Sequence, residues 1–219
     1  MAFGFFKSTV GKKYLMGLTG LVWAGFILGH MAGNLLMFIS GDVYNSYGHA
    51  ITSGGLIYVV EAALILSLLI HVKLAIQLTA ENRKSRGVGY RGKASGTKKV
   101  SLASRTMVIQ GTVILAFIIL HLITFKYGPH YETTVNGVPM RDLFKLVVEV
   151  FQNPIYVVWY LVALALLMAH LSHGFGSVFQ SFGFLDHGHR GLVKMASWTY
   201  AVLVAGGFMA QPIYVFLAR

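Results

Sequence analysis

The stretch Gly29-His30-Met31-Ala32-Gly33-Asn34 places a histidine deep inside an apolar run that extends from Tyr14 to Ile39. A run of this length can cross a bilayer, because a membrane-spanning helix needs about 20 apolar residues. A histidine inside hydrocarbon is costly unless a partner satisfies its ring nitrogens, so it often marks a functional site. Three further apolar runs each contain one histidine, and these are His71, His121 and His170. Four predicted membrane helices therefore carry one deep histidine each.

The composition is that of an integral membrane protein. Of the 219 residues, 56% are hydrophobic and only 11% are charged, whereas a soluble domain carries roughly 25% charged residues. The first apolar run is too long for the core of a signal peptide, so we interpret it as the first span. The absence of cysteine excludes thiolate-held iron–sulfur clusters, covalent haem attachment and disulfides. Any redox centre on this chain must therefore be held by histidine or methionine.

The hydropathy pattern predicts an all-α fold, a bundle of five transmembrane helices in a single membrane domain of residues 1–219. Residues 40–54 are expected to form a short loop between the first two helices. The longer segment 126–153 is expected to contain a surface helix over Met140–Phe151, because its apolar residues recur at helical spacing. The predicted spans cover roughly residues 14–39, 55–80, 104–125, 154–180 and 196–217.

The distribution of positive charge predicts the orientation of the bundle. Five spans place the two termini on opposite sides of the membrane. Segments 1–13, 81–105 and 181–195 fall on one side and carry 13 of the 18 Lys and Arg residues, whereas loop 40–54 carries none. Cytoplasmic loops are the ones enriched in Lys and Arg, so the N-terminus is expected in the cytoplasm and the C-terminus outside. The net charge of +11 thus reflects topology, and no nucleic-acid partner is expected.

The four deep histidines sort into two levels. With a rise of 1.5 Å per residue, His30 and His121 lie ~24 to 25 Å from the cytoplasmic ends of their predicted helices. By the same measure His71 and His170 lie ~14 to 15 Å from theirs, so the two levels are ~10 Å apart. Two levels with two imidazoles each match two b-type haems, each with its iron between two histidines. A zinc site would instead need about four ligands at one depth.

Glycines on the first helix are compatible with this interpretation. Gly25, Gly29 and Gly33 form a stripe beside His30, which lets a flat macrocycle or another helix approach closely. Two alternatives remain open from the residues alone. A deep histidine can hydrogen-bond to a neighbouring helix, and a methionine can replace one ligand. The methionines concerned are Met31, Met107 and Met168.

Two charged residues fall well inside the spans, and both are on the second helix. Lys73 follows His71 by two residues and can either meet a propionate of the inner haem or extend its chain to the interface. His173, three residues after His170, can contact a propionate or face water. The other charged residue is Glu61, about one and a half turns from the outer end of its helix.

Glu61 is the candidate for proton transfer at an outer quinone site beside His30 and His121. Oxidation of a quinol needs a proton acceptor that is open to one aqueous side, and a carboxyl at this depth can serve as one. The alternative is a hydrogen-bonded structural acid. The same pocket can be lined by residues of the first outer loop, which otherwise form an interfacial aromatic belt; these are Tyr44, Tyr47 and His49.

Several short motifs, in a specific order, resemble one known family. The motifs in the first helix are Ser8-x-x-Gly11-Lys12-Lys13-x-x-Met16-x-x-Thr19-Gly20 and Gly29-His30-x-x-Gly33-Asn34-Leu35. Those in later helices are His121-Leu122-x-Thr124-Phe125-Lys126-Tyr127-Gly128 and His170-Leu171-x-His173-Gly174-Phe175. Together with His71 they resemble the cytochrome b membrane anchor of succinate dehydrogenases and fumarate reductases, of the five-helix, di-haem type. The resemblance covers nearly the whole chain apart from segment 129–152.

This resemblance implies a set of expectations about function. The outer haem iron would be bound by His30 and His121, and the inner haem iron by His71 and His170. The partners would be an iron–sulfur subunit and an FAD flavoprotein on the cytoplasmic side of a bacterial inner membrane. The chain would exchange electrons with a quinone, expected to be menaquinone, in the lipid bilayer, with no succinate or fumarate chemistry of its own. The rival functions are the cytochrome b of a hydrogenase or formate dehydrogenase, and a haem-free proton-coupled transporter.

Overall fold

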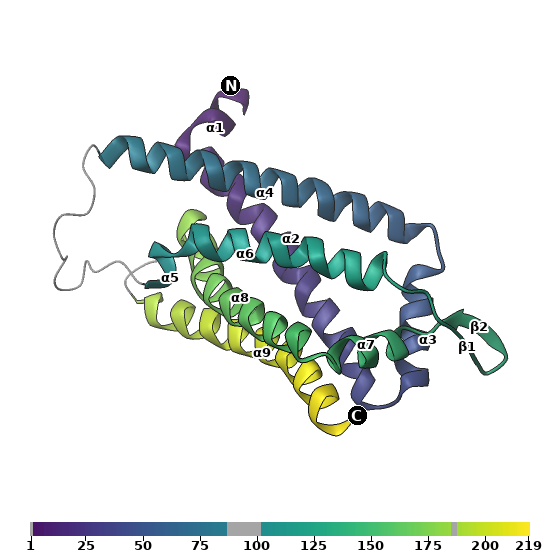
Figure 1. Cartoon of the computed structure of the whole chain (residues 1–219). Coiled ribbons are helices and arrows are strands. Elements are labelled where there is room, and N and C mark those ends of the chain that lie inside the picture. The colour runs from purple at the N-terminus through teal and green to yellow at the C-terminus, as the bar shows by residue number, and fades with distance from the viewer. Residues whose placement is uncertain (1, 87–101, 185–187) are drawn as a thin grey trace.

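The computed structural model describes residues 2–86, 102–184 and 188–219. Five long helices make up most of this part of the chain (Figure 1). Each is long and apolar enough to cross a membrane, α6 together with the π-helical turn η3 that continues it. The predicted class, a membrane-spanning helical bundle, is therefore confirmed. The five helices are α2 (Thr9–Leu35), α4 (Leu56–Arg86), α6 (Met107–His121), α8 (Pro154–Ser181) and α9 (Arg190–Ala218).

Most of the long helices extend further into polar sequence than hydropathy predicts. Helix α2 begins at Thr9, where the Ser8 hydroxyl accepts a hydrogen bond from the Gly11 amide at 3.1 Å. Helix α4 continues past the predicted span to Arg86. Hydropathy marks only the part of a helix that matches hydrocarbon, whereas Lys, Arg and Glu also favour helix beyond it. The start of α8 was predicted correctly, with Asn153 as its cap and Pro154 in its first turn.

One end of the bundle is closed by short elements, and we call it the hairpin end. The loop predicted over residues 40–54 is wrong, because residues 41–52 form a helix that Ser40 caps. The predicted surface helix is present but begins at Leu143, after a two-stranded hairpin that was missed. Asn136 and Gly137 turn this hairpin with positive φ angles of 52° and 78°, as tight hairpin turns require. The elements are α3 (Gly41–Thr52), β1 (Glu132–Val135), β2 (Val138–Arg141) and α7 (Leu143–Phe151).

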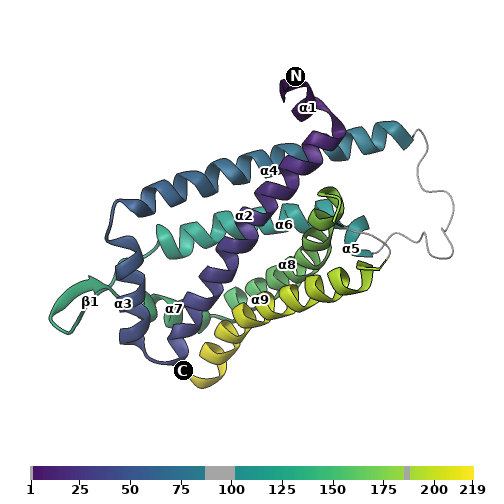
Figure 2. The same cartoon turned by 180° about the vertical axis from the view of Figure 1, so that it is seen from behind.

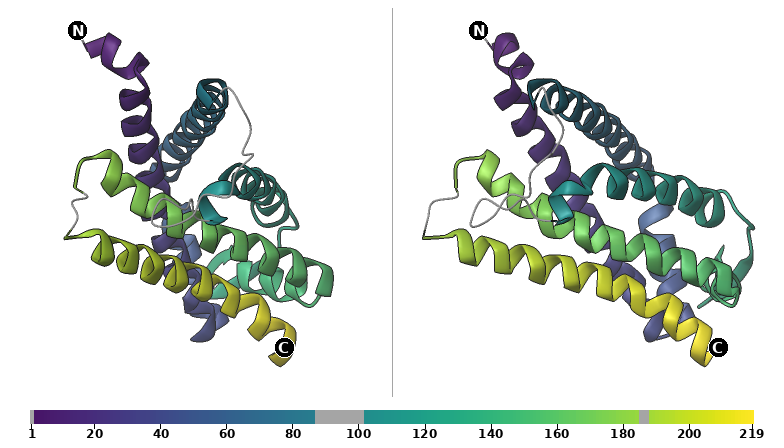
Figure 3. Two further views of the ribbon diagram at one scale, coloured as in Figure 1. Left: turned by 90° about the vertical axis from the view of Figure 1, so that its left-hand side faces the viewer. Right: turned by 60° about the vertical axis from the view of Figure 1, so that its left-hand side comes forward.

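Helices α8 and α9 run antiparallel along much of their length, and α2 crosses the bundle to contact both of them and α4 (Figures 2 and 3). An ion pair between Lys12 and Glu81 joins the start of α2 to the far end of α4. The C-terminus lies at the opposite, hairpin end, where Gln152 donates a hydrogen bond to the Arg219 carbonyl at 3.5 Å. We call the other end of the bundle the Lys12 end. Four short pieces complete the chain: α1 (Ala2–Lys7), η1 (Leu36–Phe38), α5 (Leu102–Arg105) and η3 (Leu122–Lys126).

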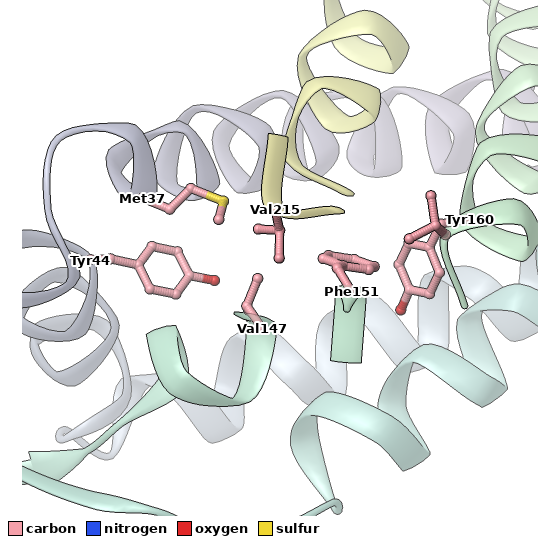
Figure 4. Packing of buried hydrophobic residues seen from close by; sticks show 7 residues of the cluster. Met37, Tyr44, Val147, Phe151, Tyr160 and Val215 are labelled. Atoms are coloured by element: carbon pink, nitrogen blue, oxygen red, sulfur yellow. The ribbon is translucent and has the colours of Figure 1, made fainter. Parts of the chain in front are cut away.

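The larger of two apolar clusters among the described residues holds the hairpin end together (Figure 4). It joins η1, α3, α7, α8 and α9, and its labelled members are Met37, Tyr44, Val147, Phe151, Tyr160 and Val215. By contrast, α4 exposes many large apolar side chains, among them Leu56 and Tyr58. In a bilayer such a surface meets lipid instead of water. A second cluster packs α8 and α9 against α2 around Leu171, Ala201 and Val204, so the apolar core follows these helices and the arrangement around α4 is more open.

Candidate site between four helices

The structure brings the predicted outer histidines into contact. His30 lies near the end of α2 and His121 is the last residue of α6. Their ring centroids are 5.9 Å apart and their planes are inclined by 81°. A metal bound between two imidazoles, at about 2 Å per metal–nitrogen bond, would hold the ring centroids roughly 6 Å apart. The separation of this pair is therefore compatible with one metal ion between the rings.

Aromatic side chains surround this outer pair. Phe26 stacks on His30 with centroids 5.4 Å apart, and Phe117 stacks on His121 at 5.8 Å. Phe125 contacts His121 from the far side, at 5.3 Å. These rings replace water around the imidazoles with apolar surface, which is the environment that a large flat cofactor needs in order to be held without covalent bonds.

Different groups contact the Nδ1 atoms of the outer pair. Nδ1 of His121 lies 3.0 Å from the Tyr160 hydroxyl, which can donate or accept. Nδ1 of His30 lies 3.3 Å from the Asn34 amide nitrogen, which also donates to the His30 carbonyl at 2.8 Å. An amide nitrogen only donates, so this contact favours a hydrogen on Nε2 of His30. Binding of a metal through Nε2 would require Asn34 to give up its hydrogen bond to Nδ1. His30 is therefore the least well arranged of the four histidines for metal binding.

The inner histidines lie near each other, in the middle of α4 and α8. His170 lies close enough to His71 for their ring charges to interact. Each ring rests against a glycine of a neighbouring helix. A Cβ atom on Gly20 of α2 would lie 3.6 Å from Cε1 of His71, and one on Gly111 of α6 would lie 3.8 Å from Cε1 of His170.

The positions of Gly20 and Gly111 give the distance between the inner and the outer pair of histidines, because each glycine contacts an inner histidine and shares a helix with an outer one. Gly20 precedes His30 by ten residues, and Gly111 precedes His121 by ten residues. At 1.5 Å per residue, both helices place the inner level ~15 Å from the outer one. This exceeds the ~10 Å obtained from the predicted helix ends, because residues in contact across two helices give the relative depth directly, without a choice of helix end. The sorting of the histidines into two pairs is unchanged.

The inner ring nitrogens have unequal surroundings. Nδ1 of His71 lies 3.1 Å from the Thr19 hydroxyl. Nδ1 of His170 is buried and has no hydrogen-bond partner within the described ranges. A buried polar atom without a partner costs about 1 to 3 kcal/mol. His170 therefore lacks the hydrogen-bond acceptor that usually orients a histidine ligand through its second nitrogen.

The surrounding backbone leaves space on one side of α2. Among the described spanning helices, α4 packs closely against α2 alone. A Cβ on Gly25 or Gly29 would meet no atom of another described element within 4 Å. Gly33, which was expected to share this role, is covered by the ring of Tyr47. The predicted glycine stripe is therefore divided, with two members facing open space and one packing against α3.

The methionine alternative finds no support at Met31. Its sulfur lies only 2.6 Å from the position that a Cβ atom on Gly207 of α9 would occupy. Met31 therefore packs between α2 and α9. Among the described residues, no three His, Asp or Glu side chains gather as a metal-ion site. The deep histidines are therefore arranged in pairs.

The acid Glu61 forms an ion pair with Lys126, a partner that the sequence did not reveal. Lys126 was assigned to the segment after the third span, but the π-helical turn η3 carries it back to the bundle. Arg141 fixes this turn by donating hydrogen bonds to the carbonyls of Lys126 and Pro129, at 3.4 and 3.0 Å. Single π-helical turns occur frequently at functional sites.

The remaining predicted residues are placed less decisively. Lys73 is exposed on α4. His173 is half-buried, with Nε2 3.3 Å from the Ser177 hydroxyl. Tyr44 is buried and donates a hydrogen bond to the Asn34 side chain at 2.9 Å, so it acts in packing near His30. His49 is half-buried on α3.

Comparisons of the chain with protein-family models, with curated proteins and with solved structures find no match.

Proposed function

We propose that this protein is the di-haem cytochrome b membrane anchor of a succinate:quinone oxidoreductase, either a succinate dehydrogenase or a fumarate reductase. The observation that carries this proposal is the gathering of four deep histidines into two pairs of neighbours. The outer pair is His30 and His121, with ring centroids 5.9 Å apart. The inner pair is His71 and His170, on α4 and α8.

The four histidines would hold two haem b groups, one at each level. When bound, haem supplies an iron that gains and loses one electron, which is the chemistry that an electron-carrying subunit needs. The residues of this chain orient the imidazoles, surround them with aromatic side chains and exclude water. The helices α2 and α6 set the distance between the levels, because each contributes to both.

The partners of the proposed complex follow from the family resemblance. An iron–sulfur subunit and an FAD flavoprotein would dock at the Lys12 end, on the cytoplasmic side. Exposed Arg83 and Lys84 lie on the last turns of α4 at that end. The flavoprotein would interconvert succinate and fumarate, and this chain would exchange the electrons with menaquinone or another quinone. The membrane would be the inner membrane of a bacterium.

The quinone would react near the hairpin end, beside the Glu61–Lys126 ion pair. The side chains of this pair are 32% and 37% exposed, and at the membrane surface that the proposal assigns to them both would reach water. A carboxylate with such access can accept a proton from a bound quinol and release it to water. Arg141 would keep Lys126, and through it Glu61, in place.

Haem content tests the proposal directly. The purified, natively folded chain should contain two b haems in a pyridine haemochrome assay and a reduced-minus-oxidised spectrum. His71→Ala and His170→Ala should each remove the inner haem and leave part of the outer one. His130→Ala is the matched control, because this histidine is exposed at the hairpin end, and it should retain both haems.

The other outcomes separate the rival functions. A folded but colourless chain would contradict the proposal and favour the proton-coupled transporter. Two haems with hydrophilic subunits bound on the outer face would favour the cytochrome b of a hydrogenase or formate dehydrogenase. Unchanged haem content in both inner-pair variants would show that the ligand assignment is wrong.

A further inference from the structure

Two groups of α2 contact the ring of His71: the hydroxyl of Thr19 and the backbone carbonyl of Met16, which also hydrogen-bonds to the ring. Thr19 is 5% exposed, and its Oγ1 atom lies 3.1 Å from Nδ1 of His71. The same Oγ1 lies 3.0 Å from the carbonyl oxygens of Leu15 and Met16 on its own helix. Three polar groups thus converge on one buried hydroxyl, in a part of the protein that excludes water.

The two carbonyls decide the direction of the hydrogen bond to His71. A carbonyl oxygen only accepts, and a hydroxyl has a single hydrogen to donate. Thr19 therefore donates that hydrogen to the Leu15 and Met16 carbonyls and has only lone pairs left for the histidine. The hydrogen between Thr19 and His71 must come from Nδ1 of the ring. His71 is thus held as the tautomer with hydrogen on Nδ1 and a bare lone pair on Nε2.

This tautomer is the one that can bind a metal through Nε2. A histidine ligand usually donates its other ring N–H to a neighbouring acceptor, which fixes the ring and makes the ligand more basic. The other three histidines lack an equivalent arrangement. Tyr160 can act as donor or acceptor toward His121, Asn34 donates toward His30, and Nδ1 of His170 has no partner in the described part of the chain.

We propose that Thr19 is a positioning residue that presents Nε2 of His71 to the inner haem iron and strengthens it as a ligand. This inference rests on the proposed function, because it requires a haem at the inner level. A more basic ligand stabilises oxidised iron relative to reduced iron. Thr19 therefore lowers the reduction potential of the inner haem and slows its loss, and it leaves the outer haem unaffected.

The test compares Thr19→Val with its parent, each purified with both haems bound. Valine has nearly the shape of threonine but accepts no hydrogen bond. Removal of such a partner typically weakens metal binding by about 10- to 100-fold, so the inner haem should transfer to excess apomyoglobin at least about ten times faster. A redox titration should also show one haem at a more positive midpoint potential. His71→Ala, which lacks the inner haem, identifies which component shifts.

Three further variants separate positioning from packing. Thr19→Ser restores the hydroxyl and should restore both the transfer rate and the potential. Ser67→Ala removes another buried hydroxyl from the same contact between α2 and α4, one that donates to the Thr19 carbonyl at 3.5 Å and not to the ring, so it should leave both values at the parental level. Tyr160→Phe should change the outer haem instead of the inner one.

The outcomes distinguish this inference from the proposed function. If the folded parent contains no haem, both are overturned. If the parent holds two haems and Thr19→Val behaves like it, only the role of Thr19 is overturned. The role of Thr19 is also overturned if Ser67→Ala changes the transfer rate and the midpoint potential of the inner haem as much as Thr19→Val does. Should the valine variant fail to fold, Thr19→Ala, which is smaller and favours helix, gives the same comparison.

Discussion

The four deep histidines differ in what lies beside Nδ1: three have a polar group there, and Nδ1 of His170 has none in the described part of the chain. Beside His71 lies the Thr19 hydroxyl, which donates its hydrogen to carbonyls of its own helix. Beside His121 lies the Tyr160 hydroxyl, which can donate or accept a hydrogen bond. An amide donor faces His30. Hydrogen-bond direction depends on what each partner can donate, so four similar imidazoles can have different ligand strengths. Two chemically identical cofactors would acquire different properties from such neighbours.

Glu61 is the residue whose substitution tests proton transfer. In the proposed complex with hydrophilic subunits, and if the chain oxidises quinol as proposed, Glu61→Gln should lower the rate of that reaction by about 100-fold, the lower range for loss of a general base. Haem content and spectra should not change, because Glu61 contacts Lys126 and not the histidines. Glu81→Gln is the matched control, since this acid is also ion-paired, with Lys12, on the same helix. Equal rates in the two variants would rule out the role of Glu61.

At the scale of elements, the hairpin end depends on a few buried polar contacts. Asn45 on α3 is 3% exposed. Its amide donates to Asp142 at 2.9 Å, and its carbonyl oxygen accepts from the Phe144 amide at 2.9 Å. Asp142 in turn accepts from the Lys145 amide at 3.0 Å and so caps α7. Asn45 therefore joins α3 to the start of α7.

Asn45→Ala should loosen these two elements selectively. Loss of two buried hydrogen bonds should destabilise the hairpin end by about 2 kcal/mol. Hydrogen exchange of the α3 and α7 amides should then become about 30-fold faster, since each 1.36 kcal/mol is a factor of ten. Asn82→Ala, at an exposed position on α4, serves as the control. Exchange in α3 and α7 that matches the control would show that Asn45 does not hold them together.

Tyr131 attaches the hairpin to the face of α7. Lys145 lies 4.4 Å from the centre of its ring. The Glu149 carboxylate, which accepts a hydrogen bond from the phenol, raises the pKa of Tyr131 above its ordinary value. A raised folded pKa means that this contact stabilises the hairpin below the ordinary tyrosine pKa and is lost as pH rises through the folded value.

Glu149→Gln should lower the pKa of Tyr131 toward about 10, the value of an unperturbed tyrosine. The titration can be followed by the 13C shift of the labelled phenol carbon, assigned with Tyr131→Phe. Glu132→Gln, which removes the charge next to Tyr131 in sequence, should leave the titration unchanged. A pKa of Tyr131 that does not respond to Glu149→Gln would contradict the assigned hydrogen bond.

At the scale of the whole molecule, two helix pairs repeat one arrangement. Gly20 and His30 on α2 are ten residues apart, as are Gly111 and His121 on α6. In both pairs the glycine contacts the inner histidine of the next spanning helix, α4 or α8. The two halves run in the same direction, so this is a parallel repeat. These four helices thus differ from the inverted repeat that would favour a transporter.

The orientation of the bundle can be measured because the natural chain contains no cysteine. His130→Cys, at the hairpin end, should react with a membrane-impermeant maleimide in intact cells. Ser85→Cys, exposed near the end of α4, should react only after the membrane is permeabilised. Both expectations follow from the excess of Lys and Arg on the Lys12 side. The reversed labelling pattern would place the partner subunits on the outer face.

The sequence was enough to predict the class of fold and the sorting of the four deep histidines into two pairs, but it underestimated the distance between the pairs. Five apolar runs are long enough to span a bilayer, and a helix has a fixed rise per residue, so position along the chain converts to depth. The start of α8 was also readable, because Asn153 and Pro154 act on the backbone next to them. The hairpin was readable in principle from Asn136-Gly137, but its strands are too short to show alternation.

The tertiary structure was needed to identify the polar groups that each deep side chain contacts. Nothing in the sequence links Thr19 to His71, or Glu61 to Lys126, because these partners are 52 and 65 residues apart and lie on different helices. Such contacts depend on the rotation of one helix against another, which hydropathy does not encode when most faces are apolar. The physical reason is general: local sequence sets the path of each helix, whereas packing sets which polar atoms become neighbours.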